Sequence, residues 1–115
     1  MANLEQSKNS ISSSNYDRVV TLERQFGPYK MMSSLFDYTT LTENPNFTIV
    51  TFKDAVYRGL IIEGNRREGV GIMIYESGRA YEGEWLNDKR HGMGYEKYKH
   101  GNEYTGHFER GKANG

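Results

Sequence analysis

A tyrosine followed two residues later by a glycine recurs at a nearly constant interval in the second half of the chain. The pattern begins at Tyr57, Tyr81 and Tyr104, so the spacing is first 24 and then 23 residues. An interval of this length, kept over consecutive units, is typical of repeat proteins, in which each unit buries its apolar face against its neighbours. A catalytic loop needs its glycines once, whereas a repeat needs them in every unit. The periodicity therefore predicts a stacked architecture.

Other positions recur in register with the tyrosines. Trp85 and Phe108 stand four residues after their tyrosines, Ile61 takes this position in the first unit, and a Gly-x-Gly pair follows in each full unit. The first unit is one residue longer, and the extra residue falls between Gly59 and Gly69. The repeat domain, 57–115, is therefore divided into the units 57–80, 81–103 and the partial unit 104–115.

The residues of each unit predict an antiparallel β-hairpin. Side chains alternate along a strand, so Tyr-x-Gly-x-Trp places three residues on one face, and the central glycine leaves space for an aromatic ring. Segments such as "NDKRHG" supply the turns. Residues 47–56, "FTIVTFKDAV", predict a strand and a turn at Lys53–Asp54, and they look like a degenerate half-repeat. We therefore expect an all-β fold, an elongated antiparallel β-meander of stacked hairpins.

This combination of residues resembles the membrane occupation and recognition nexus (MORN) repeat. The resemblance rests on Tyr-x-Gly-x-(Trp/Phe), a turn and a Gly-x-Gly pair in register over 57–115. It implies an elongated sheet that serves as a scaffold or adaptor and holds partner helices or extended segments. It also implies an alternative role, as the accessory module of a longer enzyme such as a phosphatidylinositol phosphate kinase or a SET-domain lysine methyltransferase.

The N-terminal part of the chain does not follow the repeat. Residues 1–15 are dominated by Ser and Asn and are predicted to be disordered. The segment 16–46 is predicted to be a partly helical arm or linker, because Val19, Leu22 and Phe26 stand at helical spacing. This arm either docks in the groove of its own sheet or recruits a second protein. A second apolar stretch at helical spacing contains Met31, Met32, Leu35 and Phe36.

Composition and spacing argue against several kinds of chemistry. The chain of 115 residues has no Cys and a formal net charge of zero, so it offers no thiolate site and no long-range attraction to nucleic acid. His91, His100 and His107 lack the spacing of metal ligands. Glu82 and Glu84 share a strand face, where neighbouring basic residues would pair with them. We therefore predict no enzyme activity, no cofactor and no metal.

The sequence also indicates a location. The first residues, "MANLEQSKNS", lack the apolar run of a secretory signal, and the longest apolar run, "GLII", is too short to cross a bilayer. We expect a cytoplasmic protein. The resemblance places it at the cytoskeleton or the membrane periphery.

The aromatic residues of the repeat are the candidate partner-binding site. Tyr and Trp are the residue types that dominate binding hot spots, and a curved sheet would leave some rings open as a groove. We expect this groove to receive a helix or an extended segment of a protein partner. The candidate residues are Tyr57, Tyr75, Tyr81, Trp85, Tyr98, Tyr104 and Phe108.

The basic residues of the main turns are a second candidate site. Stacked units would line these turns along one edge of the sheet, where they would meet phosphoinositides or other anionic lipid head groups. Acidic residues in the same turns weaken the positive field. The candidate lipid-binding residues are Arg66, Arg67, Lys89, Arg90, Arg110 and Lys112.

The partial third unit predicts an exposed strand edge. Residues 104–115 supply one strand and a turn, so Tyr104–Phe108 would have an unpaired side. This edge favours either an edge-to-edge homodimer or continuation of the array in a longer protein.

Overall fold

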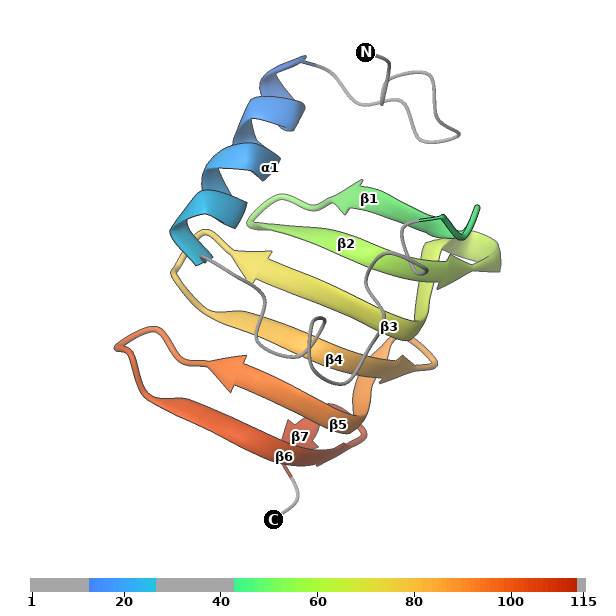
Figure 1. Cartoon of the computed structure of the whole chain (residues 1–115), viewed down its shortest axis with the longest axis vertical. Helices are drawn as coiled ribbons and strands as arrows, with labels where there is room; N and C mark the ends of the chain where they lie inside the picture. The colour runs from blue at the N-terminus through green and yellow to red at the C-terminus, as the bar shows by residue number, and fades with distance from the viewer. Residues whose placement is uncertain (1–12, 27–42, 114–115) are drawn as a thin grey trace.

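A computed structural model describes residues 13–26 and 43–113 of the chain. In this part, helix α1 (Ser13–Phe26) precedes seven strands that form one sheet in sequence order, with every neighbouring pair antiparallel (Figure 1). The predicted all-β meander of stacked hairpins is therefore confirmed. The strands are β1 (Phe47–Thr51), β2 (Ala55–Ile62), β3 (Arg66–Tyr75), β4 (Ala80–Leu86), β5 (Lys89–Lys97), β6 (Glu103–Glu109) and β7 (Lys112–Ala113).

The turns between the strands explain why the first unit is longer. Asn87 and Asp88 join β4 to β5 with positive φ angles of 51° and 68°, the geometry of a two-residue hairpin turn whose twist suits the flanking strands. The turn between β2 and β3 is instead the three-residue segment η2, Glu63–Asn65. The extra residue of the first unit therefore lies in this turn, within the interval that the sequence predicted.

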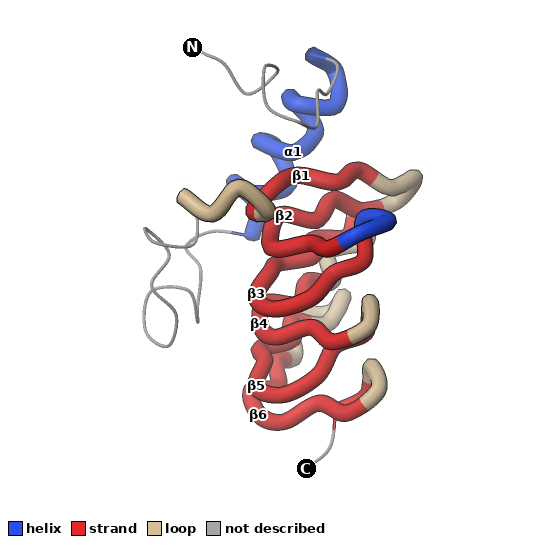
Figure 2. Tube along the Cα trace, turned by 90° about the vertical axis from the view of Figure 1, so that its right-hand side faces the viewer, coloured by secondary structure: helices blue, strands red, loops and turns tan. Residues whose placement is uncertain are grey.

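The strands bend sharply, so the sheet is a trough rather than a flat layer. Arg90 and Glu96 stand near opposite ends of β5, where a straight strand would separate their Cα atoms by about 20 Å. Their side chains nevertheless meet, with Nη1 of Arg90 2.9 Å from Oε2 of Glu96. Register shifts at Gly59/Ile61 and at Gly83/Trp85 mark β-bulges, which bend strands. Figure 2 views the strands nearly end-on and shows their turns curling toward one side.

The bend gives the sheet an inner and an outer face, each with its own apolar core. The inner face lies inside the trough, and all of its core residues come from the strands. The outer face is covered in part by α1, whose residues Val19, Leu22 and Phe26 are buried against the sheet. The inner core consists of Ala55, Tyr57, Ile61, Met73, Tyr81, Trp85 and Phe108.

The N-terminal helix starts earlier than the sequence predicted. It begins at Ser13, inside the segment 1–15 that was predicted to be disordered. Ser and Asn are favoured at the start of a helix that packing stabilises further along, so their abundance here does not exclude helix. The rest of the predicted disordered segment and the second apolar stretch, which begins at Met31, lie outside the described residues.

Candidate functional site

The aromatic rings of successive units form a continuous column on the inner face. Tyr57 and Tyr81 both meet Trp85 edge to face, with ring centroids 5.5 and 5.1 Å apart. Tyr81 meets Phe108 at 4.9 Å, and Tyr104 meets Phe108 at 5.3 Å. Edge-to-face contact is a favourable geometry for aromatic pairs. The column therefore ties the repeats together from β2 to β6.

Each tyrosine of the column folds over glycine backbone. The hydroxyl of Tyr57 donates a hydrogen bond to the carbonyl of Leu60 at 2.7 Å, and that of Tyr81 donates to Glu84 at 2.8 Å. A Cβ atom on Gly71, in the neighbouring strand, would stand 2.1 Å from the Tyr57 hydroxyl oxygen. The glycines recur with the tyrosines because each ring occupies the space where a side chain would otherwise lie.

Four of the seven predicted partner-binding rings are buried in this column. Tyr57 and Tyr81 have no exposed surface, Trp85 is 5% exposed and Phe108 is 2% exposed. The sequence shows that they share a face, but the bend of the strands closes that face over them. They therefore do not line an open groove, which corrects that part of the sequence prediction. Tyr75, Tyr98 and Tyr104 remain partly exposed, and binding by them stays a prediction.

The buried hydroxyls predict a cooperative alkaline transition. Burial raises the pKa values of Tyr57 and Tyr81 well above the ordinary value of 10.0. Their contribution to stability is therefore complete below about pH 10 and is lost as the pH rises toward the higher values of the folded state. In an alkaline titration, we expect the ultraviolet absorbance of tyrosinate from these two residues to appear together with loss of near-ultraviolet circular dichroism. Gradual ionisation of all nine tyrosines in a folded protein would contradict this.

Arginine side chains cover the column. The guanidinium carbon of Arg67 lies 4.6 Å from the Trp85 ring centroid, and that of Arg90 lies 5.3 Å from the Phe108 centroid. Arg67 and Arg90 are equivalent in the repeat, since each precedes the first glycine of its Gly-x-Gly pair by two residues. Cations over aromatic rings are stabilised by the ring electrons. The trough is therefore filled by rings and closed by guanidinium groups.

These arginines are also paired with acids. Nε of Arg67 lies 2.6 Å from Oδ1 of Asp88, and the hydrogen bond from Arg67 holds the pKa of Asp88 below its ordinary value. Arg90 and Arg79 both reach Oε2 of Glu96, at 2.9 and 3.0 Å, and Glu96 is only 4% exposed. The pair of Arg90 with Glu96 joins the two arms of the trough, whereas Arg79 reaches Glu96 from the same arm.

Removal of the Glu96 carboxylate should destabilise the protein. We expect Glu96→Ala to lower the free energy of unfolding by about 2 kcal/mol, because Arg79 and Arg90 both lose the carboxylate that they share. The partial exposure of Arg79 and Arg90, 42% and 21% of their side chains, keeps the loss below that of a fully buried pair. Urea unfolding measures it. Glu76→Ala, which breaks a more exposed pair, is the control; equal losses in both variants would contradict the prediction.

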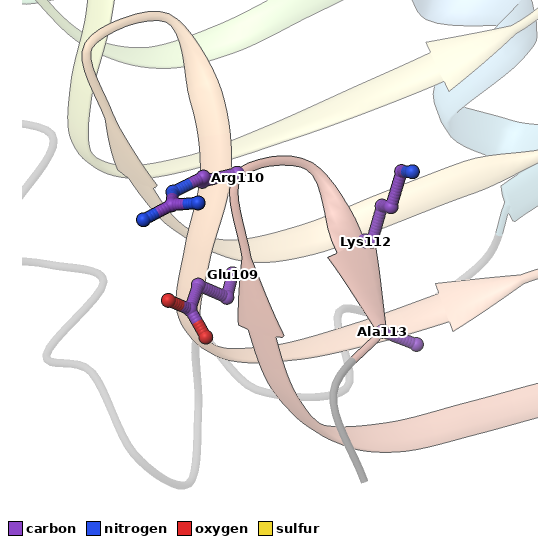
Figure 3. A pocket seen from close by; sticks show the side chains of 4 residues that line it. All are labelled: Glu109, Arg110, Lys112 and Ala113. Atoms are coloured by element: carbon purple, nitrogen blue, oxygen red, sulfur yellow. The ribbon is translucent and has the colours of Figure 1, made fainter.

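The predicted basic edge is smaller than the sequence suggested. Arg67 and Arg90 point into the trough and are paired there, which corrects their assignment to exposed turns. Figure 3 shows the last turn, where an open pocket of about 400 Å³ is lined by Glu109, Arg110, Lys112 and Ala113. Its lining carries both charges and no large apolar side chain, so it does not define a ligand. The exposed basic residues of the main turns are Arg66, Lys89, Arg110 and Lys112.

A row of partly exposed rings runs along one arm of the inner face. Tyr75 and Tyr98 belong to the predicted site, whereas Phe52, which is 41% exposed, was missed by the sequence analysis. The three rings are 23 residues apart and stand at the ends of β1, β3 and β5. Because one strand lies between the strands of successive rings, the rings are two strand spacings apart, about 10 Å. We call Phe52, Tyr75 and Tyr98 the aromatic rim. The shared interval of 23 residues is the sequence signal that could have identified Phe52.

Arginines lie beside the aromatic rim. The guanidinium carbon of Arg79 is 5.1 Å from the Tyr75 ring centroid, and that of Arg67 is 5.5 Å from the Phe52 centroid. The rim therefore combines partly exposed aromatic rings with cationic groups that are held in place by Glu96 and Asp88.

The helical arm docks on the opposite face from the one that the sequence suggested. We expected this arm to occupy the aromatic groove if it docked in cis, but α1 packs on the outer face. The Phe26 ring meets the Tyr95 ring edge-on, with centroids 6.3 Å apart. The inner face is already filled by its own rings, whereas the outer face offers aliphatic side chains such as Ile72 and Ile74.

The neighbouring carboxylates Glu82 and Glu84 both belong to β4. Both belong to the face opposite Tyr81, as the alternation predicted. Oε1 of Glu84 accepts a hydrogen bond from the backbone N–H of Met93 at 2.7 Å, where the ladder between β4 and β5 is interrupted. Glu82 is fully buried. The expected partners were basic side chains, so the backbone bond of Glu84 corrects that expectation.

In residues 13–26 and 43–113, no group of three or more His, Cys, Asp or Glu side chains is arranged to hold a metal ion. Over the same residues, no helix is long and apolar enough to cross a bilayer.

The structure is that of a repeat protein, because successive β-hairpins stack in one sheet and their aromatic rings pack over glycine backbone. The family model for the MORN repeat matches residues 63–78, 81–103 and 104–115. These residues are thus MORN repeats, and the resemblance inferred from them is confirmed. MORN repeats are found in scaffold proteins associated with membranes and the cytoskeleton and are generally non-catalytic.

One curated protein shares sequence with this chain. It is the "Inactive protein tyrosine kinase pTKL" of Plasmodium falciparum (isolate 3D7), which is 35% identical over 51 residues. The match covers 44% of this chain, and the chain spans 3% of the length of that relative. The likeness therefore concerns a segment of that protein rather than its whole.

Proposed function

We propose that this chain is a non-catalytic scaffold that binds a protein partner along the aromatic rim. The observation that carries the proposal is the regular row of partly exposed rings, Phe52, Tyr75 and Tyr98, with Arg67 and Arg79 beside it. Aromatic residues and Arg are enriched at protein interfaces, and clustered examples carry most of the binding energy. Tyr75 packs against the inner core, which reduces the ordering that binding requires of this ring.

The spacing of the rim suits a partner segment that crosses the strands. Rings about 10 Å apart match three residues of an extended chain or seven residues of a helix. A single segment of either kind would meet each ring once. By analogy with other MORN proteins, we propose that the partner is cytoskeletal or membrane-associated and that binding takes place in the cytoplasm.

Peptide selection followed by matched substitutions tests this function. Peptides selected from a displayed random library against the whole chain serve as probes, and calorimetry measures their affinity. We expect Phe52→Ala and Tyr98→Ala each to weaken binding about tenfold or more, the loss typical of a hot-spot residue. Leu86→Ala is the matched control, because Leu86 is as exposed as Phe52, at 41%, but lies on the outer face. Selected peptides that bind the rim variants unchanged would refute the proposal.

A second candidate function is binding to anionic lipid along the edge of the main turns. Ile62 and Leu86 are exposed there, at 38% and 41%, and each pairs in register with an exposed basic residue, Arg66 or Lys89. Apolar residues beside cations suit a charged membrane surface. Vesicles that contain phosphatidylserine should bind the chain, and Arg66→Glu with Lys89→Glu should abolish binding. Equal binding to uncharged vesicles would exclude this candidate.

A third candidate role is that of an accessory module that positions a catalytic domain in a longer protein. The likeness to a short segment of a much longer relative supports it. Sequencing the gene beyond the codon for Gly115 tests it, because a catalytic domain encoded there is what this role requires.

A further inference from the structure

Helix α1 is held on the outer face by one apolar stripe. Its residues Val19, Leu22 and Phe26 are 1%, 6% and 8% exposed, and they stand at positions i, i+3 and i+7 of the helix. We call the surface beneath them the helix seat, which consists of Ile49, Val56, Ile72, Ile74, Ala80 and Tyr95.

Polar contacts fix the direction of the helix on this seat. Nε of Arg18 lies 2.7 Å from Oε2 of Glu76, and Nη2 of Arg18 donates to the carbonyl of Lys53 at 2.8 Å. Further along the helix, Glu23 pairs with Arg58 at 3.3 Å. The seat therefore presents acceptors near one end and a cation near the other, so it distinguishes the two orientations of a helix.

The sheet does not depend on α1 for its inner core. That core and the strand ladders contain only residues of the sheet. Helix α1 has 14 residues, a length that is marginally stable in water on its own. Twenty residues, 27–46, connect it to β1. Helix α1 therefore covers the outer core without belonging to the strand ladder, and only the segment 27–46 joins it to the sheet in the chain.

We propose that the helix seat is a binding site for an amphipathic helix of a partner protein, with α1 as its resident intramolecular competitor. The contacts of α1 define the chemistry of that helix. It has apolar residues at i, i+3 and i+7, an arginine directly before the first and an acid directly after the second. Exchange of one such helix for another leaves the apolar seat covered in both end states, whereas release of α1 alone would expose it. This surface is separate from the aromatic rim, so the two proposals stand or fall independently.

A labelled peptide with the sequence of residues 13–26 is the probe, and fluorescence anisotropy measures its binding to the full chain. In wild type, tethered α1 competes at an effective concentration on the order of millimolar. The double variant Val19→Asp/Leu22→Asp releases α1 and should bind the peptide at least about tenfold more tightly than wild type. A peptide that carries the same two substitutions should not bind.

Charge reversal identifies the seat as the site. In the released variant, adding Arg58→Glu should weaken binding of the peptide, and Glu23→Arg in the peptide should restore it. A second released variant, Arg18→Ala/Glu23→Ala, weakens α1 only through its peripheral contacts. This variant replaces the aspartate variant in the binding experiment if the aspartate substitutions disturb the sheet. Hydrogen exchange of the strand amides shows whether they do.

Three results would overturn the proposal. The first is a released variant with a protected sheet that binds no peptide. The second is equal affinity for wild type and the released variant, because α1 would then not compete. The third is a dimer in which each α1 occupies the seat of the other copy, since that would assign the seat to a second copy of the chain.

Discussion

Replacing Tyr81 with alanine should lower the free energy of unfolding by about 4 kcal/mol, a loss typical of deleting a buried aromatic ring. The side chain has no exposed surface and touches both Trp85 and Phe108 in the column. Its hydroxyl also donates to the carbonyl of Glu84, and Arg90 lies over its ring. Loss of the ring interrupts the column in the middle of the sheet. Since a small domain is stable by only about 5–15 kcal/mol, much of the folding free energy would be lost.

Chemical denaturation of wild type and variant, followed by circular dichroism, measures this loss. The matched control is Tyr98→Ala, because Tyr98 is partly exposed on the aromatic rim. We expect that control to lose less than about 1 kcal/mol. Similar losses for both tyrosines would show that the column does not hold the repeats together.

Gly94→Ala should cost about 3 kcal/mol, at the upper end for overpacking. A Cβ atom at this position would lie 2.4 Å from Cε1 of the Tyr81 ring, and the ring is packed too tightly to move aside. The backbone of Gly94 does not have a positive φ angle, so the cost comes from the collision rather than from backbone strain. Thermal or urea unfolding measures it.

A double-mutant cycle separates this collision from other effects. In the Tyr81→Ala background the obstructing ring is gone, so Gly94→Ala should cost less than about 0.5 kcal/mol there. The coupling of more than about 2 kcal/mol would be large for a residue pair in contact. Additive losses would mean that Gly94 is needed for a reason other than the ring above it.

The repeated units were predictable from the sequence because their constraints are local and recur. Tyr57, Tyr81 and Tyr104 require a glycine beneath the ring, and the resulting interval marks every hairpin. Strand alternation also placed these rings on one face. It did not predict that this face is closed, because closure depends on contacts between the arms, such as that of Arg90 with Glu96, which alternation does not encode.

The candidate surfaces were predicted less completely. Phe52 was missed because β1 lacks the Tyr-x-Gly signal, although Phe52 keeps the 23-residue interval to Tyr75. Helical spacing identified Val19, Leu22 and Phe26 as one stripe. It could not identify the face that receives them, because that depends on which face the sheet has already filled with its own rings.

Every strand of the sheet pairs only with strands next to it in the sequence. During translation, the sheet can therefore form one hairpin at a time, because each new strand pairs with a strand that has already been synthesised. Helix α1 is the exception, because it is synthesised first and part of its seat, Tyr95, belongs to β5. During translation, α1 leaves the exit tunnel long before its own seat is complete. Throughout that interval, the earliest segment of the domain is available to other binding surfaces in the cell.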